Sequence, residues 1–322
     1  EMKNEFDKAS MRLDVKENIL YFLDPAILKT LLQDRITHKN IIWATNDYSS
    51  LGEQYAADQQ IVMSCITGLF GNTIRPRSDK SKAEQTARIR DKAEVFTPSW
   101  VCNCQNNLVD HAWFGRSDVF NTEIEKGWIT NYEKVVFPDK KGKSWQDYVK
   151  ENRLEITCGE APYLASRYDT VTGEPIPIKD RIGLLDRKLR IVSENVGEES
   201  EWLAWAKRAV QSVYGFDWQG DNVLLARENL LFTVMDFYEE KFHNSLAKNI
   251  KYLNEIARVL SWNIWQMDGL KFVVPNSCSP ECIGCKKRDI SKHDGIYCKI
   301  YDWSANRSIE FYSLYKGKKH GN

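Results

Sequence analysis

The sequence lacks a surplus of charge, long apolar runs and internal repeats, and each absence narrows the classes of protein to consider. Lys and Arg together number 45, as do Asp and Glu, so any nucleic-acid surface has to be a local patch. No run approaches the about 18 apolar residues of a membrane-spanning helix, so we expect no membrane contact. The polar, acidic first residues differ from a secretory signal peptide.

The cysteines are too unevenly placed for a disulfide framework. Four of the eight fall between residues 278 and 298, and the others are scattered. A secreted disulfide scaffold is shorter and more evenly stapled, so we expect a reduced, cytoplasmic protein. With 322 residues, 42% of them hydrophobic, the chain can form one large core or a core with an appended lobe.

From residue 153 onward, short β-prone segments alternate with helical ones. Strand patterns occupy 154–159, 213–218 and 263–269, and helical patterns occupy 163–169, 181–195, 200–213, 221–242 and 250–262. Strands separated by helices predict βαβ units, and therefore an α/β fold with a mostly parallel sheet flanked by helices. We expect three regions: a mainly helical N-terminal region (1–92), a central domain (93–275) and a Cys-rich C-terminal extension (276–322).

Three further elements are expected outside this alternation. Asp24 and Pro25 are typical of an N-cap and first helical residue, so a helix should begin there. The segment 40–45, "NIIWAT", predicts a strand, and the segment 99–115 after Pro98 predicts a helix.

Three predicted strands end in acidic residues, Glu155, Asp217 and Asp268. Ligands of parallel sheets bind at the carboxyl ends of the strands. S-adenosylmethionine suits this arrangement, because its ammonium, ribose hydroxyls and adenine amine can each pair with a carboxylate. Trp218 could stack on the adenine, and Gly159 permits close backbone approach. Pyrophosphate binding is the weaker interpretation, because Gly159 is not followed by the further glycines of a dinucleotide-binding turn.

Four segments together resemble the adenine-N6 DNA methyltransferases of restriction–modification systems, particularly their modification subunits. "AEVFTPSWV" (93–101) is similar to their Phe-Thr-Pro motif, and "LEITCGEAPYL" (154–164) to their Asp-Pro-x-x-Gly-x-Gly loop. "VYGFDWQGDNVLLARENLL" (213–231) resembles the segment with the ribose-binding acid, and "NIWQMDGL" (263–270) the strand with the adenine-binding aspartate.

This resemblance implies a Rossmann-like S-adenosylmethionine-dependent methyltransferase fold with DNA as partner. The cofactor-binding residues it implies are Phe96, Thr97, Pro98, Glu155, Cys158, Gly159, Ala161, Asp217, Trp218 and Asp268. Two positions depart from the family pattern: Ile156 replaces its usual proline, and Ala161 replaces its last glycine.

The family's catalytic motif, Asn/Asp-Pro-Pro-Tyr/Phe, has no counterpart, because none of the nine prolines is followed by another. Asp24-Pro25 is the only partial match, but it lacks the second proline and the aromatic residue, so the catalytic residues are unknown.

Two explanations are open. Either this is a short protein that requires a partner, such as a catalytic, specificity or restriction subunit, or it is part of a longer enzyme that continues beyond this segment. The functions left open are DNA adenine methylation, a non-catalytic cofactor- or DNA-binding subunit, and small-molecule methylation.

Two further segments each have one functional interpretation and one in which the residues have no specific function. Cys278, Cys282, Cys285 and Cys298 predict a structural zinc site with His293 as reserve ligand; the alternative is four free thiols. The basic stretch 74–92 contains seven Lys or Arg against three acids. It is either a solvated loop and helix or a patch that contacts DNA phosphates.

Overall fold

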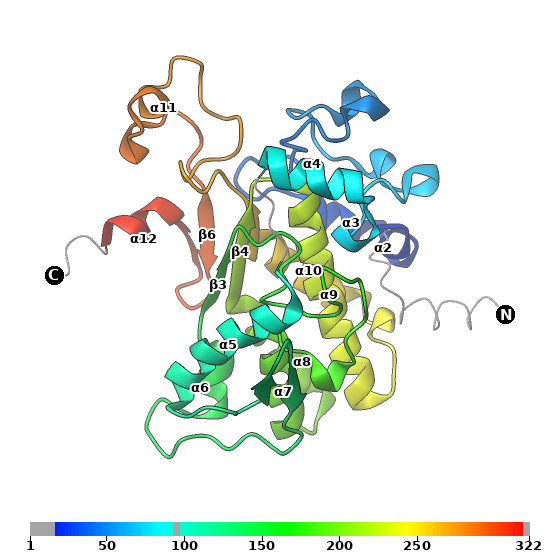
Figure 1. Cartoon of the computed structure of the whole chain (residues 1–322), viewed down its shortest axis with the longest axis vertical. Coiled ribbons are helices and arrows are strands. Elements are labelled where there is room, and N and C mark those ends of the chain that lie inside the picture. The colour runs from blue at the N-terminus through cyan, green and yellow to red at the C-terminus, as the bar shows by residue number, and fades with distance from the viewer. Residues whose placement is uncertain (1–16, 93–96, 318–322) are drawn as a thin grey trace.

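The computed structural model describes residues 17–92 and 97–317, which form a mixed α/β fold around a three-stranded parallel sheet (Figure 1). Phe96, a predicted cofactor residue, lies outside these residues. Among the described helices, none has the length and apolar character needed to cross a membrane.

The first half of the chain is mostly helical. Its elements are α2 (Glu17–Leu23), α3 (Pro25–Leu32), α4 (Lys82–Lys92), α5 (Ser99–Phe114), β1 (Asn121–Ile124), β2 (Gly127–Thr130), α6 (Trp145–Lys150) and β3 (Arg153–Ile156). The second half contains α7 (Leu184–Asn195), α8 (Glu199–Gln211), β4 (Val213–Asp217), α9 (Gly220–Phe242), α10 (Ile250–Asn263), β5 (Ile264–Gln266), α11 (Ile283–Lys287), β6 (Lys299–Asp302), β7 (Arg307–Glu310) and α12 (Phe311–Gly317).

The sheet has the order β3-β4-β5, and both pairings are parallel, which confirms the predicted parallel sheet flanked by helices. Glu155 lies opposite Gly215, and Gly215 lies opposite Ile264. Every residue of β4 is buried, as expected for a central strand covered on both faces. β3 is one of the two edge strands, and its Leu154 and Ile156 are 47% and 65% exposed.

The two faces of the sheet contact different parts of the chain. Val213 and Ile264 belong to the large core that includes α9 and α10. On the opposite face, Tyr214, Phe216 and Trp265 pack against the C-terminal segment that contains β6 and α12 (Figure 1). The alternation of side chains along each strand therefore places two separate apolar clusters on the two faces of the sheet.

The N-terminal region joins the same large core. Asp24 caps α3 as predicted, since its Oδ1 accepts a hydrogen bond from the N–H of Ala26 at 2.9 Å. The predicted strand at 40–45 is wrong, because only isolated bridges form there. Ile42 is held instead by the side-chain amide of Gln266, whose oxygen and nitrogen pair with its backbone N–H and carbonyl at 2.9 and 2.8 Å.

The predicted helix at 163–169 is also wrong, because this segment is a turn. The N–H and the hydroxyl of Ser166 donate to Asp186 at 2.8 and 3.0 Å, and Asp186 also accepts the N–H of Gly183 at 3.1 Å. The carboxylate of Asp186 lies 20 residues away from Ser166, so these bonds hold the segment in place of helical backbone bonds.

Candidate functional site

A cavity of about 700 Å³ lies at the carboxyl ends of β3 and β4, where the sequence predicts a ligand site. Small-molecule sites commonly enclose about 300–1,000 Å³. The predicted cofactor residues that line the cavity are Thr97, Glu155, Cys158, Gly159, Asp217 and Trp218. They come from the turn before α5, from β3 and the loop after it, and from the end of β4. The fold thus brings most of the predicted set to one concave site.

Asp217 connects the loop after β3 to the loop after β4. Its Oδ2 accepts a hydrogen bond from the N–H of Gly159 at 2.9 Å, and its Oδ1 accepts one from the N–H of Gln219 at 2.9 Å. The side-chain amide of Asn222 donates to the same Oδ1 at 3.4 Å. A ligand hydroxyl could take the place of the long bond from the Asn222 amide. Asp217 therefore shapes the cavity and can still contact a ligand.

Glu155 lines the cavity, and one of its carboxyl oxygens is buried without a hydrogen-bond partner among the described residues. Its side chain is buried, and its Oε1 accepts one long bond, 3.4 Å, from the N–H of Tyr163. Within the described residues, Oε2 has no partner. Burial raises the pKa of Glu155 well above its ordinary value, and the nearby charge of Asp217 raises it further. A cationic ligand group beside Oε2 would favour the ionised form.

The loop after β3 has an unusual backbone. Thr157, Gly159 and Ala161 have φ values of 47°, 53° and 63°, all in the left-handed region. This region is rare for a β-branched residue such as Thr157, and residues held in it cluster at ligand sites. A Cβ added at Gly159 would meet no atom within 4 Å, so its backbone conformation rather than crowding favours glycine.

Two predicted residues that line the cavity are fixed by hydrogen bonds that involve the backbone. The indole N–H of Trp218 donates to the carbonyl of Ala44 at 3.1 Å, which holds its half-buried ring at the wall. The carbonyl of Thr97 accepts the hydroxyl of Thr170 at 3.1 Å. The positions of both residues are therefore set by segments distant in sequence.

The other three predicted residues near the cavity, Cys158 in its lining and Ala161 and Pro98 behind it, have packing or backbone roles. The thiol of Cys158 is buried, and burial raises its pKa well above the ordinary value, so it is a packing group rather than a nucleophile. Ala161 is fully buried, and Pro98 precedes the first turn of α5. Neither Ala161 nor Pro98 lines the cavity.

Asp268 does not join the other two strand-end acids, so its predicted place in the site is wrong. It is absent from the residues that line the cavity. Its Oδ1 accepts the N–H groups of Leu270 and Lys271 at 3.0 and 3.2 Å, and its Oδ2 pairs with the ammonium of Lys271 at 3.3 Å. Asp268 is thus the acceptor of a tight turn after β5.

Two cavity residues at the start of α9, Gln219 and Asn222, are not among those predicted from the sequence. Their neighbour Asp221 is buried and contacts Arg88 at 2.9 Å and Lys80 at 3.5 Å. Burial opposes ionisation of Asp221, but the charges of Arg88 and Lys80 hold its pKa well below its ordinary value. Arg88 also donates to the side chain of Gln219 at 2.7 Å. In the sequence, only the polar residues at the start of α9 could have indicated that Gln219 and Asn222 border the cavity.

This network corrects both interpretations of 74–92, the solvated loop and helix and the patch that contacts phosphates. Arg77, Lys80 and Arg88 are buried, and Arg75 pairs with Glu84 at 3.1 Å. Much of the basic charge of the stretch therefore stabilises the packing of α4 and the loop before it against α9.

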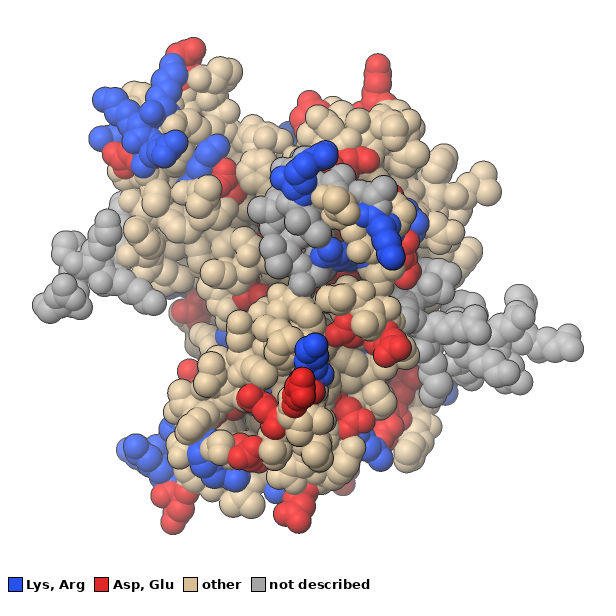
Figure 2. Space-filling view, viewed as in Figure 1, with Lys and Arg blue, Asp and Glu red and all other residues tan. Residues whose placement is uncertain are grey.

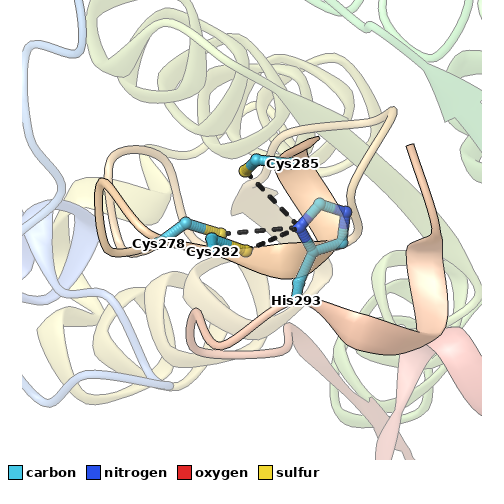
Figure 3. A group of neighbouring side chains, drawn as sticks. All are labelled: Cys278, Cys282, Cys285 and His293. Carbon is cyan, nitrogen blue, oxygen red and sulfur yellow. Dashed lines mark hydrogen bonds between the residues drawn. The ribbon is translucent and has the colours of Figure 1, made fainter. Parts of the chain in front are cut away.

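A second group of functional side chains lies in the C-terminal segment. The ligand atoms of Cys278, Cys282, Cys285 and His293 all lie within 4.8 Å of one another (Figure 3). The three sulfurs are 3.7, 3.5 and 3.6 Å from Nδ1 of His293. Zinc–sulfur bonds of about 2.3 Å and zinc–nitrogen bonds of about 2.0–2.1 Å at tetrahedral angles give separations of about 3.5–3.6 Å. The cluster could bind a metal ion such as zinc.

Cys298 was predicted as the fourth ligand, and the structure places it elsewhere. Its buried sulfur lies 3.5 Å from the carbonyl oxygen of Gln266, in the apolar cluster with Trp265 and Phe311. Cys298 immediately precedes β6 and faces the sheet, while His293, the predicted reserve ligand, completes the cluster.

Gly284 and Gly295 let the cluster close tightly. A Cβ at Gly284 would lie 2.6 Å from the backbone nitrogen of His293, and a Cβ at Gly295 would lie 2.8 Å from the sulfur of Cys278. Both glycines are therefore needed for close approach to ligand residues rather than for a left-handed turn.

Comparison of the chain with protein-family models, with curated proteins and with solved structures finds no match. The cavity and the Cys₃His cluster are therefore the features that indicate function.

Proposed function

We propose that the chain binds S-adenosylmethionine in the cavity at the ends of β3 and β4, as the cofactor-binding part of an adenine-N6 DNA methyltransferase. The observation that carries the proposal is the convergence of Thr97, Glu155, Gly159, Asp217 and Trp218 on one cavity. The order β3-β4-β5 is compatible with one half of a Rossmann-like sheet, in which ligands bind beyond the carboxyl ends of the strands.

The chemistry of the cavity matches three parts of the cofactor. The unpartnered Oε2 of Glu155 suits the ammonium group, since a buried carboxylate needs a cationic partner. Asp217 suits the ribose hydroxyls, which donate hydrogen bonds to a carboxylate. Trp218 offers an aromatic surface for the adenine, with its ring already fixed by the bond to Ala44.

The acceptor half of the reaction requires groups that this sequence does not contain. An extruded adenine must be stacked and its amine held in line with the methyl group. The chain contains no Pro-Pro pair, and hence no Asn/Asp-Pro-Pro-Tyr/Phe motif. We therefore propose that another segment or a partner subunit supplies these groups, and that this chain alone methylates DNA very slowly or not at all.

Calorimetric titration with S-adenosylmethionine tests the cofactor assignment. Asp217→Ala should weaken binding by about 1.5–3 kcal/mol, the cost of losing hydrogen bonds to a charged group. Asp268→Ala is the matched control, because Asp268 also follows a strand but does not line the cavity. Equal affinities of the wild type and Asp217→Ala would refute the assignment.

Transfer of labelled methyl groups to mixed-sequence DNA tests the second part. The isolated chain should show no robust turnover even when the cofactor is bound. Fast methylation that Asp217→Ala abolishes would mean that unfamiliar residues form a catalytic motif within this chain.

For the Cys₃His cluster we propose a structural zinc ion. Four protein ligands leave no open position for water, which distinguishes a structural site from a catalytic one. Protein purified without chelator should contain about one equivalent of zinc by elemental analysis. Metal-free protein with unchanged thermal stability would contradict this role.

A further inference from the structure

Four cationic side chains lie within the short segment that the Cys₃His cluster closes. Lys286, Lys287 and Arg288 follow Cys285 directly, and Lys292 immediately precedes His293. All four cationic residues are exposed. Figure 2 shows a group of Lys and Arg side chains over α11, which projects away from the sheet in Figure 1. We call these four residues the knuckle surface.

Acidic neighbours neutralise the knuckle surface only in part. Lys286 pairs with Glu281, and Lys292 pairs with Asp289 at 2.9 Å, in both cases at the protein surface. In the described part of the chain, Lys287 and Arg288 form no ion pair. Exposed ion pairs are weak, so both lysines can exchange a carboxylate for another anion.

The backbone of the knuckle surface lies between candidate metal-ligand residues and does not belong to a long helix or strand. α11 contains five residues and cannot be stable by itself, since isolated helices shorter than about 12–15 residues are marginal. Cys282 precedes α11, Cys285 lies inside it, and His293 follows Lys292. A metal ion bound to these three residues would fix the backbone that presents the cations. Fixing them beforehand lowers the entropy cost of binding a polyanion.

We propose that the knuckle surface binds the phosphates of duplex DNA. The proposal deepens the proposed function and rests on it, because DNA is the substrate named there. Phosphate contacts from Lys and Arg position a duplex without reading its sequence. The knuckle surface also replaces the stretch 74–92 as the main phosphate contact, since Arg77, Lys80 and Arg88 of that stretch are buried and two of them are paired with Asp221.

A different role for the same cations would be to balance the negative charge of three thiolates around a metal ion. That role predicts weaker metal binding when the cations are removed and no change in DNA affinity. Zinc content and DNA affinity, measured on the same variants, therefore separate the two roles.

The test is fluorescence anisotropy of a labelled mixed-sequence duplex with the full chain, loaded with zinc, over a series of salt concentrations. The variant is Lys287→Gln with Arg288→Gln. The slope of log affinity against log salt is negative, and each lost phosphate contact should reduce its magnitude by about 0.9. Loss of both contacts should therefore make the slope less negative by about 2. The control is Lys140→Gln with Lys141→Gln, an exposed lysine pair outside the C-terminal segment.

The expected result is a reduced slope in the knuckle variant, an unchanged slope in the control, and equal zinc content in both. An unchanged slope in the knuckle variant, an equal reduction in the control, or tighter binding of single-stranded RNA than of the duplex would overturn the proposal. Affinity for S-adenosylmethionine, measured on the same variants, should not change. If the wild type does not bind S-adenosylmethionine, the proposed function is refuted, whatever the DNA measurements show for the knuckle surface.

Discussion

Replacing Glu155 by glutamine should uncouple cofactor binding from proton release. The substitution keeps the size of the side chain and the acceptor for the N–H of Tyr163, but removes the ionisable group. Burial raises the pKa of Glu155, so the carboxyl group is favoured in its neutral form in the empty cavity. The ammonium of S-adenosylmethionine favours the ionised form. Binding should therefore release up to one proton.

The size of the effect follows from linkage. While Glu155 is neutral in the free protein and ionised in the complex, affinity should rise by up to about tenfold per pH unit. Glu155→Gln should abolish this slope. It should also raise Kd by about 10- to 150-fold where the pair is formed, corresponding to about 1.5–3 kcal/mol for a hydrogen bond to a charged group.

The assay is titration calorimetry between about pH 6 and 7, below the ligand's own ammonium pKa of about 7.7–8.0. Buffers with different ionisation enthalpies report the protons released. Methylthioadenosine, which lacks the amino-acid portion, is the control ligand and should release none from the wild type. An identical pH slope in the wild type and Glu155→Gln would refute the reasoning.

Three further predictions concern the parts of the fold that support the two sites. His293→Ala should lose the metal, whereas Cys298→Ala should retain it and lose thermal stability. Elemental analysis and melting curves measure the two effects. Loss of the metal in both variants would mean that Cys298 is a ligand after all. Burial raises the pKa of Glu17 to about 8 and that of its neighbour Glu228 well above its ordinary value. The stability from these neutral carboxyls is present below about pH 4.3 and is lost as the pH rises through 8. The double variant Glu17→Gln with Glu228→Gln should therefore show a weaker dependence of melting temperature on pH between about pH 5 and 8. The same pH dependence in the wild type and the double variant would contradict this. Arg88→Ala leaves a buried carboxylate without its main partner and should lower the free energy of unfolding by about 3–5 kcal/mol in denaturant titrations, with a loss under 1 kcal/mol counting against it.

Local patterns in the sequence predicted the elements whose causes are local. The cap at Asp24 depends on neighbouring residues, and the helix at 99–114 follows a proline as expected. The alternation after residue 153 predicted the parallel sheet, because strands separated by helices leave few other arrangements. Glu155 and Asp217 line the same cavity, since adjacent parallel strands end at the same edge.

The errors arise where partners are distant in sequence. Arg88 contacts a carboxylate 133 positions away, so no local pattern separates it from a solvated cation. Cysteine spacing alone could not show that Cys298 faces the sheet while His293 faces the other thiols. Asp268 follows a strand as Asp217 does, but its carboxylate serves the turn after it.

The most direct test of the central claim is a crystal structure of the chain with S-adenosylhomocysteine, the demethylated form of the proposed cofactor. We predict the ligand in the cavity beyond β3 and β4, with its amino group within hydrogen-bonding distance of Glu155. Its ribose hydroxyls should contact Asp217, and its adenine should lie against Trp218. A ligand bound elsewhere, or a cavity without ligand at saturating concentration, would contradict the account.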